Sequence, residues 1–248
     1  MALPLPPGLT ASEAAFLCEM EMVTVVPRQR LDSINLLSGK TPTLRPPHRA
    51  TLPLWLALLL KKQRRANIVP PAWLHPASLA QIIHHETHTN PTQFSPPPPP
   101  PSRSDGRGLA HRVNMAGSTV LSPPFLPSCT AESPAQFLPY HWLEMAEILF
   151  AHAPDDMPAS VNEIYSLVRD LVEIRAAKMR ASSGDVESFG GSVASLRGVG
   201  SAELAENRAF VLGVANGVRK LGASTEATRR EEEEARQGDE ESDEEMGL

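Results

Sequence analysis

The order of hydrophobic and polar positions predicts short strands at the start of the chain. Residues 22–26, Met-Val-Thr-Val-Val, are rich in β-branched side chains and are followed by a proline, which is typical of a short strand. A weaker alternation over 31–37 and a short segment over 49–52 predict two further strands, and a short helix is expected over 11–20. Because no strand–helix–strand repeat is visible, we expect these strands to form one small sheet.

Helical periodicity dominates the rest of the ordered sequence. Pro53 is tolerated in the first turn of a helix, and a capping box at 160–163 precedes the clearest apolar stripe. That stripe repeats at i, i+3, i+4 and i+7. Its members are Ile164, Leu167, Val168, Leu171 and Ile174. We expect helices over 54–66, 76–88, 140–153, a segment beginning at 161, and 201–222. The last of these is expected to end at Gly222.

A proline-rich segment separates the helical regions. Ten of the 25 prolines fall between 95 and 137, where neither a helical nor a strand period is visible. Six of these prolines are consecutive, which predicts a short polyproline II stretch. We therefore expect 95–137 to be a disordered segment between the helical regions.

The acidic net charge comes from the C-terminal end. Residues 231–248 contain ten acidic side chains and one basic side chain, so the net charge of −6 leaves +3 for the rest of the chain. A charge of +3 does not by itself argue for nucleic-acid binding. We expect 223–248 to be a disordered acidic tail. Ser242 precedes three acidic residues and is a candidate phosphorylation site.

These patterns predict an α+β protein with two domains. Residues 1–69 are expected to form a small β-rich domain with a connecting helix. Residues 70–94 and 138–222 are expected to form a mainly α-helical domain. The disordered insertion and the disordered acidic tail lie outside both domains.

No catalytic constellation, metal site or cofactor motif is recognisable. His84-His85-Glu86-Thr87-His88 lacks the glutamate directly after the first histidine that a zinc protease needs, so a solvated helix end is favoured. The glycines near 190 and 200 follow no predicted strand, which argues against a phosphate loop. Two cysteines exclude a disulfide scaffold, and no apolar run approaches the length of a membrane span. The sequence is typical of an interaction protein in a reducing compartment.

The candidate functional residues are therefore interaction residues. The candidates for a partner interface, or alternatively for the core, are Leu54, Trp55, Trp73, Ile164, Leu167 and Leu171. The candidate basic contacts are Lys61, Lys62, Arg64 and Arg65, which either touch DNA phosphates or form a solvated helix end that complements the helix dipole.

Several sequence blocks resemble the PSF-two family of GINS subunits. The order Glu21-Met22-Val23-Thr24-Val25-Val26-Pro27, then Leu52-Pro53-Leu54-Trp55-Leu56-Ala57, then a basic run, then Val69-Pro70-Pro71-Ala72-Trp73-Leu74 carries the resemblance. It continues in Asn162-Glu163-Ile164, Leu167-Val168-Arg169-Asp170, Arg175 and Lys178-Met179-Arg180. The blocks cover about 11–94 and 138–222 and look like those of a fungal member. The family runs directly from a Phe-x-Pro segment, here Phe94-Ser95-Pro96, into the helix that follows Leu138. The resemblance therefore implies that 97–137 is inserted, either as a retained intron, which is favoured, or as a genuine loop.

The resemblance implies a role that the residues alone do not name. Subunits of this family are non-catalytic, pair a β domain with a helical domain and form a four-subunit complex in the nucleus. That complex joins the MCM hexamer and a DHH-family activator in the CMG replicative helicase, in initiation and elongation of replication and in break-induced repair. No cofactor and no membrane contact are implied, and DNA contact is expected only in the assembly. The alternatives are a DNA-binding module that uses the basic run and a metallohydrolase that uses the histidine cluster.

Overall fold

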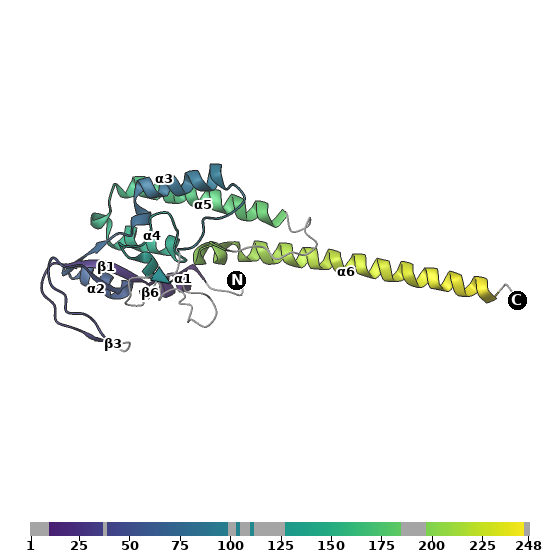
Figure 1. Cartoon of the computed structure of the whole chain (residues 1–248), viewed down its shortest axis with the longest axis horizontal. Helices are drawn as coiled ribbons and strands as arrows, with labels where there is room; N and C mark the ends of the chain where they lie inside the picture. The colour runs from purple at the N-terminus through teal and green to yellow at the C-terminus, as the bar shows by residue number, and fades with distance from the viewer. Residues whose placement is uncertain are drawn as a thin grey trace, which may run out of the picture. The chain divides into compact units, whose positions relative to one another are not determined.

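The computed structural model describes residues 10–36, 39–98, 103–104, 110–111, 127–184 and 197–245 (Figure 1). Two compact units are present in it. The first contains Met1–Met179 and Ser195–Glu206, and the second contains Arg180–Ala194 and Asn207–Leu248. Strands and helices both contribute to the first unit, which confirms the expected α+β class.

A three-stranded antiparallel sheet lies at the N-terminal end of the first unit. Strand β1 (Met22–Pro27) is central and pairs with β4 (Ala50–Pro53) on one side and β5 (Ala66–Val69) on the other. Thr24 lies opposite both Thr51 and Val69 in the two registers. The strands expected at 22–26 and 49–52 are confirmed.

The third strand of this sheet was not predicted from the sequence. Helix α2 (Leu54–Lys62) ends before residue 66, and Arg64 adopts a φ of 57°, which turns the chain back toward the sheet. The following residues then form β5, which pairs with the free edge of β1. Only β2 (Asn35–Leu36) forms within the weak pattern at 31–37, and it pairs with β3 (Gly39–Lys40) in a separate ribbon. Backbone pairing with β1 therefore decided which short segment joined the sheet.

The predicted helices of the first unit are present, with different ends. Helix α1 (Ala11–Cys18) is capped by Thr10, which forms a capping box with Glu13. The segment expected at 76–88 becomes α3 (Pro76–His84) and a single π-helical turn, η2 (His85–Thr89). The remaining helical elements are η1 (Ala72–Leu74), α4 (Trp142–His152), η4 (Pro154–Asp156) and α5 (Val161–Gly184).

One continuous set of buried side chains connects the sheet to the helices. It includes Val23 and Val25 of β1, and Trp73 and Trp142, which are both fully buried. Residues from α2, α3, α4 and α5 complete it. The β-rich and helical segments therefore contribute to a common core.

The two ends of the proline-rich segment, 95–98 and 127–137, are packed within the first unit. The prediction of disorder over 95–137 was therefore wrong at these ends. Ser95 is buried, and η3 (Pro127–Cys129) places Cys129 in the core with no exposed surface. The Ala131 N–H donates to Thr24 Oγ1 of β1 at 3.0 Å. This packing argues against the retained-intron interpretation for 127–137. Two short strands, β6 (Arg103–Ser104) and β7 (Ala110–His111), pair with each other, and the rest of 99–126 lies outside the described residues.

Placing a charge at position 129 should therefore destabilise the first unit. We expect Cys129→Asp to lower the free energy of unfolding by about 2 kcal/mol or more, because an unpaired polar group would be buried. Urea denaturation of the purified full chain measures this loss. Gln136→Asp, at an exposed position of the same segment, should change stability by less than about 0.5 kcal/mol. An equal effect of the two substitutions would contradict the buried position of Cys129.

Helix α6 (Ser201–Glu245) begins in the first unit and provides most of the second. It does not end at Gly222 as expected. A Cβ added at Gly222 would meet no atom within 4 Å, and a glycine inside a helix costs only about 1 kcal/mol. The alanine-, glutamate- and arginine-rich sequence that follows favours helix, and Arg229 pairs with Glu226 one turn away at 2.9 Å. No described helix combines the length and hydropathy of a membrane span.

Candidate functional site

Most of the apolar candidate residues lie in the core of the first unit. Four of them expose no surface: Leu54, Trp73, Ile164 and Leu171. Trp55 and Leu167 are half-buried. Of the six, only these two retain enough surface for contact with a partner.

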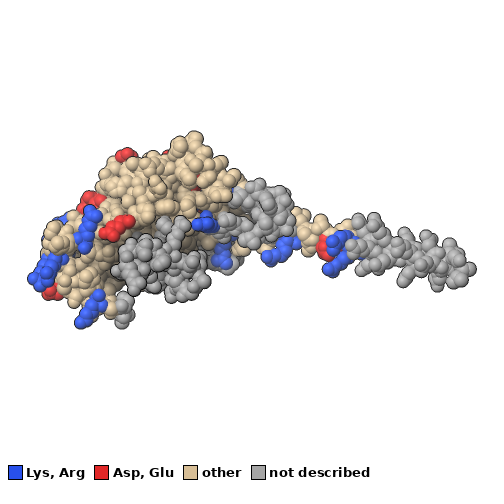
Figure 2. Space-filling model, viewed as in Figure 1, with Lys and Arg blue, Asp and Glu red and all other residues tan. Residues whose placement is uncertain are grey.

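The basic run at the end of α2 divides into one paired cation and three exposed ones. Lys61 Nζ lies 2.8 Å from an Oδ2 atom of both Asp155 and Asp156 in η4, and its side chain is only 9% exposed. Lys62, Arg64 and Arg65 are exposed, and no ion pair is found for them in the described part of the chain. Figure 2 shows several Lys and Arg side chains, with acidic ones among them, at the end of the first unit that carries the strands and α2, and others elsewhere on this face.

The Lys61 pair fixes the position of α2 over the sheet edge. Asp156 also accepts a hydrogen bond from the Ile68 N–H of β5 at 2.7 Å, so one carboxylate holds both α2 and β5. Hydrogen bonding to Lys61 lowers the pKa of the Asp155 carboxyl below its usual value. Lys61 is therefore a structural clamp rather than a free phosphate contact.

Removing this clamp should cost more than removing its exposed neighbour. We expect Lys61→Ala to lower the free energy of unfolding by about 1–3 kcal/mol, because the largely buried Asp156 loses its cation. Lys62→Ala should change it by less than about 0.5 kcal/mol. Urea denaturation of the two variants compares them directly, and similar losses would argue against the clamp.

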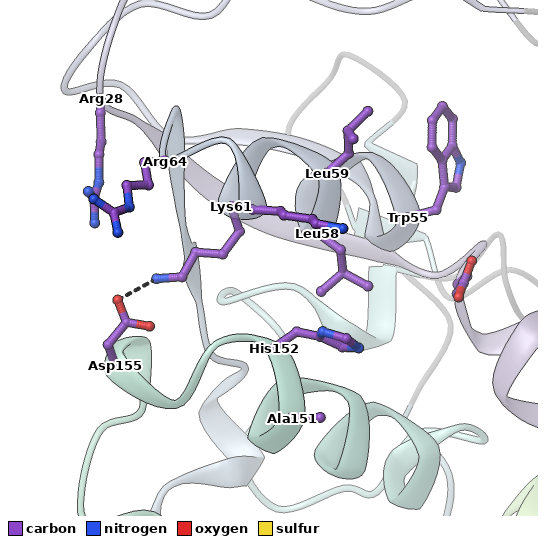
Figure 3. A pocket seen from close by; sticks show the side chains of 11 residues that line it. Arg28, Trp55, Leu58, Leu59, Lys61, Arg64, Ala151, His152 and Asp155 are labelled. Atoms are coloured by element: carbon purple, nitrogen blue, oxygen red, sulfur yellow. Dashed lines mark hydrogen bonds and ion pairs between the residues drawn. The ribbon is translucent and has the colours of Figure 1, made fainter.

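An open groove of about 850 Å³ runs along α2 (Figure 3). Trp55, Leu58 and Leu59 of α2 supply its apolar part, and His152 of α4 lies across from Leu58. Arg28 and Arg64 lie together at one end in Figure 3, and Lys62 also lines the groove. The groove therefore combines apolar and positively charged surface.

A buried ionic network joins α5 to the segments on either side of it. Arg175 donates to Glu86 of η2 and to both carboxylate oxygens of Glu203 in α6, with a 3.0 Å distance from Nη2 to Oε2. Lys178 Nζ lies 3.3 Å from Glu86 Oε2 and donates to the Asn90 carbonyl at 2.9 Å. All four charged side chains are at most 8% exposed. The prediction that 84–88 is a solvated helix end was therefore wrong for Glu86.

Electrostatics keep Glu86 ionised in this network. Burial alone would raise the pKa of its carboxyl, but the Arg175 charge and the hydrogen bond from the Ser95 N–H hold the pKa below its ordinary value. The Arg175 guanidinium also lies over the Phe94 ring, 4.8 Å from the centroid. The network thus satisfies charges that would be costly to bury alone.

Two glycines, Gly198 and Gly200, complete the network. Their sequence pattern predicted only that they do not form a phosphate loop. Gly198 has a φ of +86°, and a Cβ there would lie 2.2 Å from the Ser95 carbonyl oxygen. Its own carbonyl accepts from Arg175 Nη2 at 2.6 Å. A Cβ on Gly200 would lie 2.8 Å from Trp142 Nε1. These positions need glycine because the backbone approaches other groups closely.

A second group of titratable side chains is buried between α1, β1, η3 and α4. Glu21 is fully buried, and neither of its carboxylate oxygens has a hydrogen-bond partner among the residues that the structure describes. Burial raises the pKa of Glu21 to about 7. His141 lies 3.3 Å from Glu144 nearby, and the buried thiols of Cys18 and Cys129 also have raised pKa values, chiefly through burial.

The histidines of the 84–88 segment stack rather than converge. The rings of His84 and His88 are 4.7 Å apart and inclined by 15°. Within the described residues, no group of three or more His, Cys, Asp or Glu side chains has the geometry of a metal site. The side chain of Ser242 lies outside what the structure describes, so its phosphorylation stays a prediction.

Two family models match the chain in consecutive regions. The PSF2 N-terminal domain matches residues 10–69, and the GINS complex protein helical bundle domain matches residues 73–222. The first region contains the sheet and α2, and the second contains the helices from α3 to the first half of α6. Neither model describes an enzyme family.

Full-length relatives support the same assignment. The chain is 66% identical over 273 residues to the DNA replication complex GINS protein psf2 of Neurospora crassa and 66% identical over 251 residues to that of Gibberella zeae, in both cases over the whole of both chains. It is 32% identical over 229 residues to the Candida albicans protein, in an alignment that covers 92% of this chain and 91% of the Candida protein. The chain therefore belongs to the PSF2 family of GINS proteins.

Proposed function

We propose that this protein is a non-catalytic scaffold subunit of a heterotetrameric GINS complex that acts in chromosomal DNA replication in the nucleus. The observation that carries the proposal is the similarity over the entire length to relatives named as GINS proteins of the DNA replication complex. We further propose that this complex is part of the CMG helicase, together with an MCM hexamer and a DHH-family activator. It would act there in initiation, elongation and break-induced repair.

The exposed apolar side chains of α6 support an assembly role. Phe210, Leu212 and Leu221 are 40%, 45% and 60% exposed. Exposed large apolar residues grouped on one helix are typical of protein–protein contact surfaces. Phe210 and Leu221 are eleven residues apart and share one face of the helix.

Co-purification tests the assembly role directly. A tagged full-length chain expressed in a fungal host should retain three companions of similar size. Phe210→Glu combined with Leu221→Glu should lose at least one of them, because charges would replace the apolar contact. Ala227→Glu is a matched control, since this exposed residue lies about 120° around the helix from Leu221. A wild-type chain that purifies alone as a cooperatively folded monomer would contradict the proposal.

The DNA-binding alternative retains less support in the structure than in the sequence. Lys61 is held by two aspartates, which removes one of the four proposed phosphate contacts. Two of the remaining three cations, Lys62 and Arg64, border a groove that also contains apolar side chains.

A further inference from the structure

We propose that the groove along α2 is a docking site for an acidic, amphipathic segment of a partner protein. The proposal goes beyond the scaffold function, because it concerns a surface on the first unit that is separate from the exposed residues of α6. It requires a partner segment that carries apolar side chains on one face and several carboxylates beside them.

The apolar part of the groove accounts for the apolar face of the partner. Leu59 is 45% exposed, and Trp55 and Leu58, which also line the groove, are half-buried; Leu58 points toward His152 in Figure 3. Trp55 and Leu59 are one helical turn apart and point to the same side of α2 in Figure 3. A partly exposed tryptophan next to leucines is the kind of anchor that dominates binding energy at protein interfaces.

The charge of the groove accounts for the carboxylates. Arg28, Lys61, Lys62 and Arg64 line it together with two acids, Glu19 and Asp155. Asp155 is already paired with Lys61, so Lys62 and Arg64 remain available. Cations at the rim of an apolar surface select acidic partners and speed their association.

A small molecule or cofactor is a poorer fit to this groove. Sites of that kind present buried polar groups that fix the ligand's orientation. The buried polar atoms that lack a partner among the described residues belong to other parts of the fold, such as Glu21 and Trp73. None of them lines the groove. An extended or helical peptide needs no such buried polar anchor, because an apolar face and charged flanks suffice.

Single-stranded DNA is the competing macromolecule, because it also combines phosphate charge with bases that stack on tryptophan. The observations favour a peptide for two reasons. Two leucines lie beside the tryptophan, and carboxylates of Glu19 and Asp155 interrupt the positive surface that a phosphate backbone would follow. DNA binding is therefore an outcome that the experiment must separate.

Fluorescence anisotropy with defined probes tests the proposal on the purified full chain, together with any companions that co-purify. The first probe is a labelled 16-residue helical peptide with leucines at i, i+3, i+4 and i+7 and glutamates elsewhere. The second has the same charge but serine at every leucine position. The third is the acidic segment 231–248 of this chain, which lacks a continuous apolar face. The fourth is a 20-nucleotide oligo-dT.

We expect the leucine–glutamate peptide to bind at least about tenfold more tightly than the three other probes. Lys62→Glu combined with Arg64→Glu, and separately Leu59→Ser, should each weaken this binding about tenfold. Arg45→Glu and Ile34→Ser are matched controls, because both residues are exposed and lie outside the groove. These controls should leave the affinity unchanged.

Three results would overturn the proposal. They are no binding of the leucine–glutamate peptide, equal binding of the serine peptide, and tighter binding of oligo-dT that the groove substitutions abolish. The groove variants should still co-purify with the companions of the wild-type chain. A loss of peptide binding with intact co-purification therefore separates this inference from the assembly function.

Discussion

Replacing Arg175 by alanine is expected to destabilise the first unit by about 3–5 kcal/mol, because the substitution removes the guanidinium that pairs with the buried carboxylates of Glu86 and Glu203, while Lys178 stays 3.3 Å from Glu86. Glu86 is fully buried and Glu203 is 6% exposed, so water cannot replace the guanidinium at either one. Arg175 also holds the Gly198 carbonyl, whose loop leads into α6. The loss should therefore loosen the contact between α5, η2 and the start of α6.

Urea denaturation of the full chain measures this effect, with Arg169→Ala as the control. Arg169 pairs with Glu173 on the same helix, but both side chains are about 70% exposed. An exposed pair of this kind contributes about 0.3–0.5 kcal/mol, so the control should change little. If Arg175→Ala cost no more than Arg169→Ala, the buried network would not be a major source of stability.

Replacing Glu21 by glutamine is expected to stabilise the protein by about 3 kcal/mol at pH 8 and to have little effect at pH 4. In the folded protein, burial raises the pKa of Glu21 from its ordinary value of 4.5 to about 7. The unfolded chain therefore releases this proton at a lower pH than the folded chain does. Stability is lost as the pH rises from about 4.5 to about 7, and the difference in pKa corresponds to about 3 kcal/mol.

Glutamine removes this loss because it stays neutral at every pH. The measurement is the free energy of unfolding of wild type and Glu21→Gln from pH 4 to pH 8. Glu86→Gln provides a comparison of opposite sign, because the pKa of Glu86 is lowered and its charge is paired with Arg175. That substitution should destabilise the protein at neutral pH. If the free energies of unfolding of wild type and Glu21→Gln instead changed in parallel with pH, Glu21 would have to be exposed or paired in the folded protein.

Part of the ionic network could have been anticipated from the pattern of α5. Leu171, Arg175 and Lys178 continue the i, i+4, i+7 spacing of the apolar stripe, so the two cations fall on the buried face. Charged residues on a buried face indicate buried partners. The pattern cannot say which carboxylates those partners are, because Glu86 lies 89 residues before Arg175.

The sequence by itself determined the elements whose signal is local. Strand β1 follows from a short run of β-branched residues that a proline ends, and helices α4 and α5 follow from the helical period of their apolar residues. Family membership was also readable from the sequence, since short blocks such as 52–57 and 69–74 recur in a fixed order. The exposed end of α2 was recognisable as basic for the same local reason.

Only the tertiary structure decided the features that depend on distant partners. β5 forms because β1 offers a free edge, and Lys61 becomes a clamp because Asp155, 94 residues later, lies beside it. Cys129 enters the core because Ala131, two residues later, donates its N–H to Thr24 of β1, which lies 107 residues before Ala131. In each case the local sequence permits more than one outcome. Burial and hydrogen bonding between segments far apart in the chain select one, and a single sequence carries no local signal of such a pairing.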